Sequence, residues 1–389
     1  MITLLKNCEV YAPEKLGKKD ILLAGGKIVK IADSIDVASL GEGVEIVDIA
    51  GQKVTPGFID QHVHIIGGGG EGSFHTRTPE IMLSELTLGG TTTVIGVLGT
   101  DDITRNMESL YAKAKGLEEE GISTWIYCGS YPIPTPTLTG NVRRDMVLID
   151  KVIGTGEIAM SDHRNRCQTK LDFAQIAAEA RVGGILSGKA GVLHIHVGPG
   201  PKKLDWLFEI VEETDIPITN FTPTHCNRYL ELLQQACQWA KKGGMIDFTS
   251  SSPQIAPKRF QAYDAVKYAV NDGVDVGHIT MSSDGNGSQP VFDENLVYLG
   301  LTSADPKSLH HCLKRIVDDG TLPLEQAVRL ITSNVADNLK LPGKGHIAVD
   351  MDADLVIMDA ELNVKSVYAK GKCMVKDGVA IVKGTFEKL

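Results

Sequence analysis

The chain has 389 residues, of which 42% are hydrophobic and 23% charged, a composition typical of a soluble globular protein. The formal charge of -10 and the lack of any Lys/Arg cluster argue against a nucleic acid partner, because phosphate backbones are bound by clustered cations. We expect no membrane partner either, since no apolar stretch approaches about 20 residues. The length favours one large domain accompanied by a small one.

The cysteines and the N-terminus bear on the compartment. Seven scattered cysteines, an odd number without a CxxC pair, indicate free thiols rather than a disulfide framework or a thiolate zinc site. The N-terminal run MITLLKNCEV meets a lysine after a few apolar residues and carries no small-residue cleavage pattern. We therefore expect a cytoplasmic protein.

Both ends of the chain carry strand patterns. Residues 2–50 and 353–389 contain short alternating runs, such as ILLAGGKIVKIA and SVYAKGKCMVKDG, separated by glycine turns. These runs predict a small composite β-sandwich domain formed by residues 1–55 and 346–389. Residues 56–345 are predicted to form the catalytic, metal-binding domain.

Between the two ends, short apolar runs alternate with helical segments. Eight β/α units over roughly 230 residues match a (β/α)8 TIM-like barrel of the α/β class, with a doubly wound sheet as the main rival. The predicted strands cover residues 57–64, 91–99, 123–130, 156–162, 191–198, 218–225, 245–251 and 278–285. The predicted helices cover residues 103–121, 171–184, 202–214, 229–244, 259–273 and, as a last helix that closes the domain, 322–341.

Polar residues lie at the ends of several predicted strands. The first run, GFIDQHVH, ends in two histidines on one face, because side chains two residues apart in a strand point the same way. In a parallel barrel the carboxyl ends of all strands meet at one face, where active sites are built. The set expected to converge there consists of His62, His64, Glu157, His196, His225 and Asp284.

Some of these assignments have alternatives. His194 shares a strand face with His196, so spacing alone does not decide which is a ligand; we favour His196 because it lies nearer the end of the strand. Asp284, in the SSDGNGS segment, is also a suitable helix cap, but its position after the eighth strand favours chemistry. A single histidine is more often a core or surface residue than a ligand.

The residue types in this set suit a metal centre. Four histidines and two carboxylates favour a borderline-soft divalent ion, with Zn²⁺ as the leading choice. Six ligands exceed the needs of one tetrahedral zinc, so we expect two Zn²⁺ ions per subunit, bridged by Glu157 and a hydroxide. Zn²⁺ lowers the pKa of its bound water to about 7 and so supplies a nucleophile at neutral pH. The sequence therefore predicts a hydrolase.

A series of motifs covers nearly the whole chain in order: HVHIIGGGGEG, TRTPE, GTD, SDHR, PTHCNR, SSDGNGSQP and VYAKGKCMVKDG. With them the chain resembles the amidohydrolase superfamily and, more closely, the isoaspartyl (β-aspartyl) dipeptidases. The resemblance implies a zinc metallopeptidase that hydrolyses the isopeptide bond of a small zwitterionic dipeptide, in a homo-oligomer that is octameric in the family. It implies that His62 and His64 bind one ion together with Asp284, which is also the general base. His196 and His225 would bind the other ion.

One position departs from the family pattern. The family usually has a carbamylated lysine where this chain has Glu157, and the nearby Lys151 and Lys170 are out of register. We therefore assign the bridge to Glu157 itself. Because glutamate is shorter than lysine carbamate, the backbone or the metals must shift to compensate.

The resemblance also implies a substrate pocket. An isoaspartyl dipeptide carries one ammonium and two carboxylates, so it needs one anionic and two cationic partners. Glu71 would hold the ammonium, while Arg164 and Arg228 would hold the carboxylates, since guanidinium suits two-point pairing. Tyr131 would bind substrate and stabilise the developing oxyanion. Further backbone or hydroxyl contacts are implied for Gly69, Thr100 and Ser288.

Two other functions stay open. A cyclic amidase of the dihydroorotase or hydantoinase type would share the metal motifs, but a neutral ring gives no reason for Glu71, Arg164 and Arg228. A non-catalytic, metal-free scaffold would lack ligands, whereas each of the six positions carries a suitable one.

Overall fold

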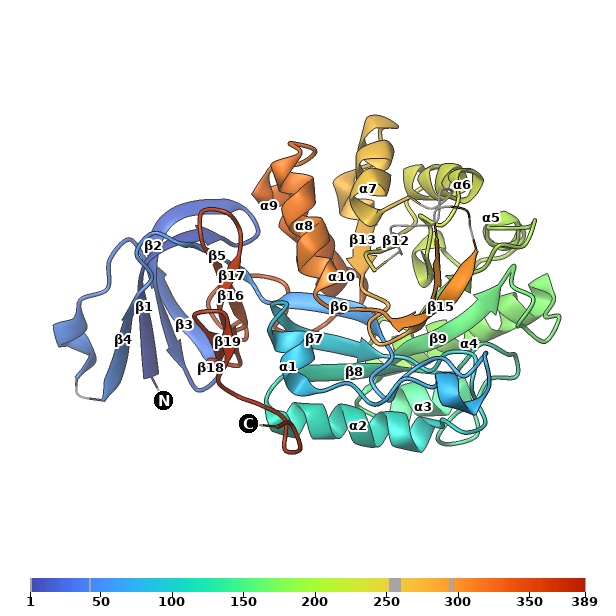
Figure 1. Cartoon of the computed structure of the whole chain (residues 1–389), viewed down its shortest axis with the longest axis horizontal. Coiled ribbons are helices and arrows are strands. Elements are labelled where there is room, and N and C mark those ends of the chain that lie inside the picture. Colours follow the sequence, from blue (N-terminus) through green and yellow to red (C-terminus); the bar gives the residue numbers. More distant parts are fainter. Residues whose placement is uncertain (1, 42, 252–259, 294, 296, 389) are drawn as a thin grey trace.

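The structure is a computed structural model that describes residues 2–41, 43–251, 260–293, 295 and 297–388. It is a mixed α/β protein in which strands from both chain ends lie side by side, next to a larger body of strands and helices (Figure 1). Each of the eight strands predicted in the middle of the chain overlaps a strand of the structure. Arg259, at the start of one predicted helix, lies outside the described residues.

The two chain ends share a nine-stranded sheet. Its order is β19-β18-β17-β16-β5-β1-β2-β3, and β4 pairs with β1. The two ends meet where β5 pairs antiparallel with β16, and side chains such as Leu5, Ile21 and Leu355 form a separate apolar core there. The strands are β1 (Ile2–Tyr11), β2 (Lys15–Ala24), β3 (Lys27–Ala32), β4 (Val44–Asp48), β5 (Lys53–Pro56), β16 (Leu355–Met358), β17 (Val364–Ala369), β18 (Lys372–Lys376) and β19 (Val379–Ala380).

The middle of the chain contains eight parallel strands. Six form a sheet in the order β11-β10-β9-β8-β7-β6, and the other two form the pair β12-β13. Within the described residues the strand pairing is thus that of a half-barrel sheet plus a pair, an arrangement consistent with a (β/α)8 barrel but without one continuous closed sheet. The strands are β6 (Phe58–Val63), β7 (Thr91–Gly96), β8 (Ser123–Cys128), β9 (Val152–Met160), β10 (Val192–Val197), β11 (Phe221–Thr224), β12 (Ile246–Thr249) and β13 (Ile279–Ser282).

Helices follow most of these strands and pack apolar side chains against them. Their starts are capped as the sequence suggests: Asn106 accepts a hydrogen bond from the Ser109 N–H at α2, and Thr169 and Asp172 form a capping box at α4. The helices are α1 (Leu83–Thr87), α2 (Met107–Glu120), α3 (Val142–Leu148), α4 (Lys170–Ser187), α5 (Asp205–Glu213), α6 (Leu230–Lys241), α7 (Ala262–Asn271) and α8 (Ser308–Asp318).

The prediction of one last helix over residues 322–341 is wrong. The structure has α9 (Leu324–Ala327), a 3₁₀ turn (Val328–Ile331) and α10 (Ser333–Asn338), with a break at Thr332. Thr332 has φ -137° and ψ -95°, outside the helical region. The side chain of Asn334 donates 2.8 Å hydrogen bonds to the carbonyls of Val276 and Ile279, so contacts with the start of β13 override the local helical pattern.

A hairpin of β14 (Ser288–Phe292) and β15 (Tyr298–Ser303) comes next in the chain after β13.

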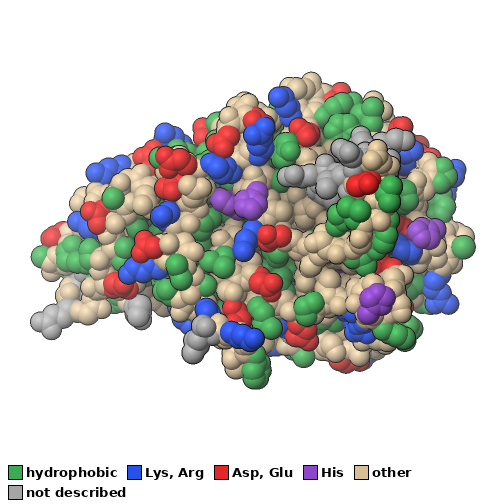
Figure 2. Space-filling view, in the orientation of Figure 1, with side chains coloured by type: hydrophobic (Ala, Val, Ile, Leu, Met, Phe, Trp, Pro, Cys, Tyr) green, Lys and Arg blue, Asp and Glu red, His purple; other side chains and the backbone are tan. Residues whose placement is uncertain are grey.

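On the face shown in Figure 2, positive and negative side chains are interspersed rather than gathered into a patch of one sign. Among the described helices, none combines the length and apolarity needed to span a bilayer. All seven cysteines are free thiols.

Candidate metal centre and substrate pocket

The structure brings the six predicted ligands together at the carboxyl ends of the parallel strands. His225 directly follows β11 and Asp284 lies two residues after the end of β13, and both adopt the left-handed backbone conformation, with φ of 63° and 55°. This conformation is uncommon for residues other than glycine and is concentrated at functional sites. The histidines and Glu157 are at most 6% exposed. The ligands lie on five strands or within two residues of their ends: β6 (His62, His64), β9 (Glu157), β10 (His196), β11 (His225) and β13 (Asp284).

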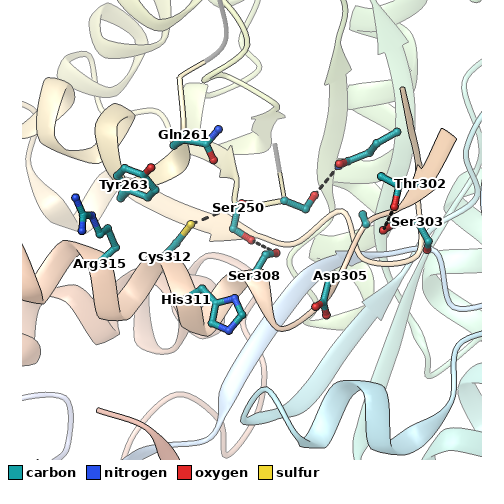
Figure 3. Close-up of a pocket in the computed structure, with 13 residues that line it drawn as sticks. Ser250, Gln261, Tyr263, Thr302, Ser303, Asp305, Ser308, His311, Cys312 and Arg315 are labelled. Atoms are coloured by element: carbon teal, nitrogen blue, oxygen red, sulfur yellow. Dashed lines mark hydrogen bonds between the residues drawn. The ribbon is translucent and has the colours of Figure 1, made fainter. Parts of the chain in front are cut away.

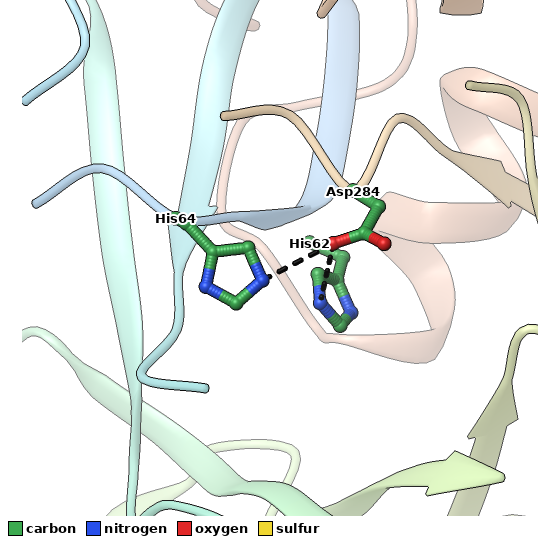
Figure 4. Close-up of side chains that lie close together, drawn as sticks. All are labelled: His62, His64 and Asp284. Carbon is green, nitrogen blue, oxygen red and sulfur yellow. Dashed lines mark hydrogen bonds and ion pairs between the residues drawn. The ribbon is translucent and has the colours of Figure 1, made fainter. Parts of the chain in front are cut away.

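One group of candidate ligand atoms belongs to His62, His64 and Asp284 (Figure 4). Their ligand atoms all lie within 4.8 Å of one another. Asp284 Oδ1 is 3.1 Å from His64 Nε2 and 3.5 Å from His62 Nε2. The carboxylate thus faces both imidazoles of the HVH motif.

A second group belongs to His62, Glu157 and His225. Glu157 Oε2 lies 3.4 Å from His62 Nε2, and Glu157 Oε1 lies 3.2 Å from His225 Nε2. Glu157 Oε1 is also 2.5 Å from Nδ1 of His196. The two oxygens of one carboxylate therefore face different sets of imidazoles.

The spacing of these atoms fits zinc. Two ligand atoms that are each about 2.1 Å from a tetrahedral Zn²⁺ lie about 3.4 Å apart, close to the His62–Glu157, His62–Asp284 and His225–Glu157 separations. His62 Nε2 and Glu157 Oε2 are buried and have no hydrogen-bond partner among the described residues. The shorter Glu157–His196 contact is a hydrogen bond, and these two side chains would have to separate to hold an ion.

The electrostatics of the cluster favour positive charge at its centre. Burial alone would raise the pKa of Glu157, but the nearby His62 and His196 hold this pKa well below its ordinary value. In the same way, His64 and His225 hold the pKa of Asp284 low despite its burial. Burial would lower the pKa of His62, yet Glu157 raises it to about 9. Both carboxylates are therefore ionised at neutral pH and attract cationic partners.

The predicted substrate-binding residues lie around the same cluster. A cavity of about 50 Å³ joins them to five of the six ligands, while His62 lies fully buried behind it. A neighbouring chamber of about 230 Å³ shares Arg164, Arg228 and Asp284 with this cavity. The predicted substrate residues that line the first cavity are Gly69, Glu71, Thr100, Tyr131, Arg164, Arg228 and Ser288.

In this structure several of these residues contact one another. Glu71 accepts hydrogen bonds of 2.9 Å from Thr100 Oγ1 and from Arg164 Nη1. The hydroxyl of Tyr131 lies 2.8 Å from His196 Nδ1. Burial, reinforced by the charge of Glu157, raises the pKa of Tyr131 well above its ordinary value. Tyr131 therefore keeps its proton at neutral pH and can donate it in a hydrogen bond.

Two glycines allow the loops to approach the site closely. Gly69 has φ 74°, and a Cβ atom there would lie 2.8 Å from Cβ of Ser288. At Gly287 a Cβ atom would lie 2.7 Å from Asp284 Oδ1. A side chain at Gly287 would therefore push directly on the proposed general base.

Asp162, in the SDHR motif, is a further residue of the site for which the sequence alone predicts no role. Asp162 is 5% exposed and receives a two-point hydrogen bond from Arg164, through Nε at 2.9 Å and Nη2 at 2.8 Å. Its Oδ2 is also 3.2 Å from His196 Nε2. Asp162 thus fixes the guanidinium of Arg164 beside the cluster.

The two histidines of the HIH segment take different places. His196 lines the cavity, whereas His194 is fully buried behind His62, with its Nε2 2.8 Å from His62 Nδ1. His194 also stacks on Tyr127, with ring centroids 4.8 Å apart. The His194 side chain can therefore orient the ring of His62, but it does not line the cavity.

A larger cavity, of about 530 Å³, lies between the β14–β15 hairpin and helix α8 (Figure 3). Ser250, Ser308 and Cys312 are among the residues on its walls, and Ser250 Oγ and Ser308 Oγ are 2.8 Å apart. None of the six candidate ligands lines it. The site chemistry is therefore concentrated in the smaller cavity.

Comparisons with known proteins identify the family and the fold. The amidohydrolase family model matches residues 234–380. The β-aspartyl dipeptidase of Fervidobacterium islandicum AW-1, whose structure was determined with a β-Asp-Leu dipeptide, is 44% identical, with a TM-score of 0.90 over 98% of both chains. D-hydantoinase from Thermus sp. has a TM-score of 0.70 over 100% of this chain and 98% of its own, but only 16% identity, so it supports the fold alone.

A more local match exists to a dihydroorotase. The enzyme of Listeria monocytogenes serovar 1/2a is 42% identical over 115 residues, which are 28% of this chain. This match spans only about a quarter of the length of the curated relative. The near-complete coverage and high identity to the Fervidobacterium enzyme are therefore the stronger evidence, and the chain belongs to the β-aspartyl dipeptidase family of the amidohydrolase superfamily.

Proposed function

We propose that this protein is a zinc-dependent isoaspartyl dipeptidase that hydrolyses the isopeptide bond of β-aspartyl dipeptides. The observation that carries the proposal is one cavity lined both by the histidine–carboxylate cluster and by Glu71, Arg164 and Arg228. One anion and two cations match the charges of a β-aspartyl dipeptide. The 44% identity to a β-aspartyl dipeptidase supports the same substrate class.

The residues that would hold the metals follow from the ligand groups. His62, His64 and Asp284 would hold one Zn²⁺, and His196 and His225 the other. The bridge would be Glu157, whose two oxygens face different imidazoles. When bound, the two ions would supply Lewis acidity, which activates water at neutral pH and polarises a carbonyl group.

Substrate binding would exchange existing contacts. Glu71 and Arg164 pair with each other at 2.9 Å in this structure. The adjacent ammonium and carboxylate of an aspartyl residue can replace this pair, with the ammonium on Glu71 and the carboxylate on Arg164. Arg228, whose Nη1 now donates to the carbonyl of Val197 at 3.0 Å, would hold the carboxylate of the leaving residue. A zwitterionic aspartyl residue gives both Glu71 and Arg164 a new partner of opposite charge, whereas a neutral ring gives them none.

Asp284 and Tyr131 would carry out the proton and charge steps. Asp284, held ionised by the surrounding imidazoles, takes a proton from the attacking water and passes it to the leaving amine. Tyr131, which keeps its proton, donates a hydrogen bond to the oxyanion that develops on the scissile amide. Gly69, Thr100 and Ser288 would position the substrate through backbone or hydroxyl contacts.

Larger features of the proposal follow the family resemblance. Residues 56–345 would act as a closed (β/α)8 catalytic barrel, and residues 1–55 and 346–389 as a composite β domain. The protein would be a cytoplasmic homo-oligomer, octameric by resemblance.

A panel of dipeptides tests the proposal. Metal-stripped and zinc-loaded protein would be assayed with β-Asp-Leu, α-Asp-Leu and other α- and β-linked pairs. We expect hydrolysis of the β-linked dipeptides alone, and only by the loaded protein. Equal hydrolysis of α-linked dipeptides, or full activity after metal removal, would contradict the proposal.

The same experiment addresses the alternatives. The local match to a dihydroorotase is the observation that favours a cyclic amidase, so dihydroorotate and hydantoin belong in the panel. Turnover of these rings without turnover of β-aspartyl dipeptides would establish that reading. A protein that takes up no zinc and hydrolyses none of the substrates would instead be a scaffold.

A further inference from the structure

The eight parallel strands have two seams where regular sheet pairing is interrupted, one between β11 and β12 and one between β13 and β6. Across the β13–β6 seam the described residues form an isolated parallel bridge between Val63 and Gly285, and one backbone hydrogen bond at each seam lies beside a candidate ligand. The Cys226 N–H donates to the Asp247 carbonyl at 3.1 Å, and the His64 N–H donates to the Gly285 carbonyl at 2.9 Å. Both seams border candidate ligands, because His225 precedes Cys226 and His64 is itself a ligand. Something beyond backbone pairing must therefore fix these strands.

The side chain of Asp247, on β12, connects the strands on both sides of these seams. It is fully buried, and each of its oxygens accepts two hydrogen bonds. Oδ1 accepts from Gln61 Nε2 at 2.6 Å and from Thr280 Oγ1 at 2.8 Å. Oδ2 accepts from Thr224 Oγ1 at 2.6 Å and from Ser282 Oγ at 2.5 Å. An ionised carboxylate has about four acceptor positions, and here all are occupied.

The four donors lie on the strands that carry ligands. Gln61 directly precedes His62 on β6, and Thr224 directly precedes His225 after β11. Ser282 ends β13, two residues before Asp284, and Thr280 lies on the same strand. One carboxylate on β12 is thus bonded to the three strands that present three of the candidate histidines and the proposed general base.

A charge in this position is effective because it is buried. Hydrogen bonds to an ionised acceptor are about twice as strong as those between neutral groups, and an interior with low dielectric strengthens them further. An amide in place of the carboxylate would offer one acceptor oxygen and would direct an NH₂ group at the remaining hydroxyls. Those hydroxyls can rotate, so the fold can survive this change while the connection across the seams weakens.

We propose that Asp247 is a positioning residue that joins the two parallel sheets across both seams and so sets the relative positions of His62, His225 and Asp284. Its carboxylate is hydrogen-bonded to Gln61, Thr224, Thr280 and Ser282 rather than to these ligands, so it positions them through their neighbours in the chain. The joining of the sheets is independent of any metal. Its consequence for zinc binding rests on the proposed function.

Amide hydrogen exchange of metal-free protein tests the joining of the sheets directly. In Asp247→Asn we expect the amides of Cys226 and His64, which cross the seams, to exchange at least about tenfold faster than in wild type. The amide of Ile126, which bonds to the Lys151 carbonyl inside the six-stranded sheet, should keep its wild-type rate.

Asp145→Asn is the matched control. Asp145 is also fully buried and accepts hydrogen bonds from the N–H groups of Leu138 and Thr139 and from Thr139 Oγ1, but it lies in α3, away from the seams. The Asp145→Asn substitution should destabilise the protein without accelerating amide exchange at Cys226 or His64. Wild-type exchange at both amides in Asp247→Asn, or equal acceleration in the control, would overturn the inference.

Should Asp247→Asn fail to fold, Thr224→Val removes a single hydroxyl donor. Its control is Thr124→Val. Thr124 lies on strand β8, and its buried hydroxyl donates a 2.7 Å hydrogen bond to the Ala114 carbonyl. We expect faster exchange at Cys226 in Thr224→Val and not in Thr124→Val. Equal rates at Cys226 in the two variants would overturn the inference.

Zinc affinity, measured by competition with a chelator, separates this inference from the proposed function. Asp247→Asn should bind zinc about tenfold more weakly than Asp145→Asn, in the range seen when groups that support metal ligands are removed. A wild-type protein that takes up no zinc would refute the proposed function, while the exchange rates would still decide the role of Asp247. Zinc affinity unchanged in Asp247→Asn would refute the positioning of the ligands.

Discussion

Replacing Glu71 by glutamine tests the charge logic of the proposed substrate pocket. The carboxylate of Glu71 accepts 2.9 Å hydrogen bonds from Thr100 Oγ1 and Arg164 Nη1. Glutamine preserves the size of the side chain and one acceptor oxygen but removes the negative charge. The variant should therefore fold normally and lose only its attraction for the ammonium of the substrate.

The exposure of the site sets the size of the effect. The side chains of Glu71 and Arg164 are 39% and 27% exposed, so solvent weakens charge pairs at this position relative to buried ones. Substrate binding must also separate Glu71 from Arg164, which offsets part of the gain. We therefore expect a loss of about 1–2 kcal/mol in transition-state stabilisation, which is a fall of about 5-fold to 30-fold in kcat/KM.

The assay compares β-Asp-Leu with N-succinyl-leucine, which contains the same amide and carboxylates but lacks the ammonium. Wild-type protein should prefer β-Asp-Leu, and Glu71→Gln should lose this preference while its kcat/KM for succinyl-leucine stays the same or rises. Glu80→Gln is the control, because Glu80 is 57% exposed and pairs with Lys113 at 3.4 Å. If Glu71→Gln slows both substrates equally, or leaves the preference intact, Glu71 does not bind the ammonium.

Three further substitutions test the catalytic cluster. Asp284→Asn should reduce kcat by about 10²- to 10⁴-fold with an unchanged circular dichroism spectrum, and near-wild-type turnover would exclude Asp284 as the base. Gly287→Ala should reduce kcat by about 10²-fold, because its Cβ would lie 2.7 Å from Asp284 Oδ1; an unaffected kcat would show that the loop yields freely. Glu157→Gln should bind fewer than two zinc ions per subunit by elemental analysis, and a full complement of two would rule out Glu157 as the bridge.

The positions of the strands could be predicted from the sequence because each is a short apolar run with a polar end. The same rule placed His62, His64 and His225 at one edge, since parallel strands all end on the same side of a sheet. The rule does not predict which carboxylate oxygen faces which imidazole nitrogen. Glu157 Oε2 faces His62 while Oε1 faces His196, and this choice depends on side-chain rotamers in the folded protein.

Other features depend on contacts between residues far apart in the chain. The pattern over residues 322–341 favours a continuous helix, but Asn334 bonds to carbonyls of Val276 and Ile279 and the chain turns at Thr332. Local propensity contains no information about such partners. The ion pair between Glu71 and Arg164 could not be predicted from the sequence either, although the charge of each residue indicated its proposed role.

In the proposed metal centre, Glu157 would take the place that, by the family resemblance, usually belongs to a carbamylated lysine. A shorter side chain reaches fewer partners unless the partners approach it, and here the imidazoles of His62 and His225 lie 3.4 Å and 3.2 Å from its oxygens. The approach is possible because the strands that carry these two histidines are themselves held close, through Gln61 and Thr224, by the buried carboxylate of Asp247. If both proposals hold, the close approach of these strands compensates for the shorter side chain of Glu157, and the proposed bridge and the proposed link between the sheets depend on each other.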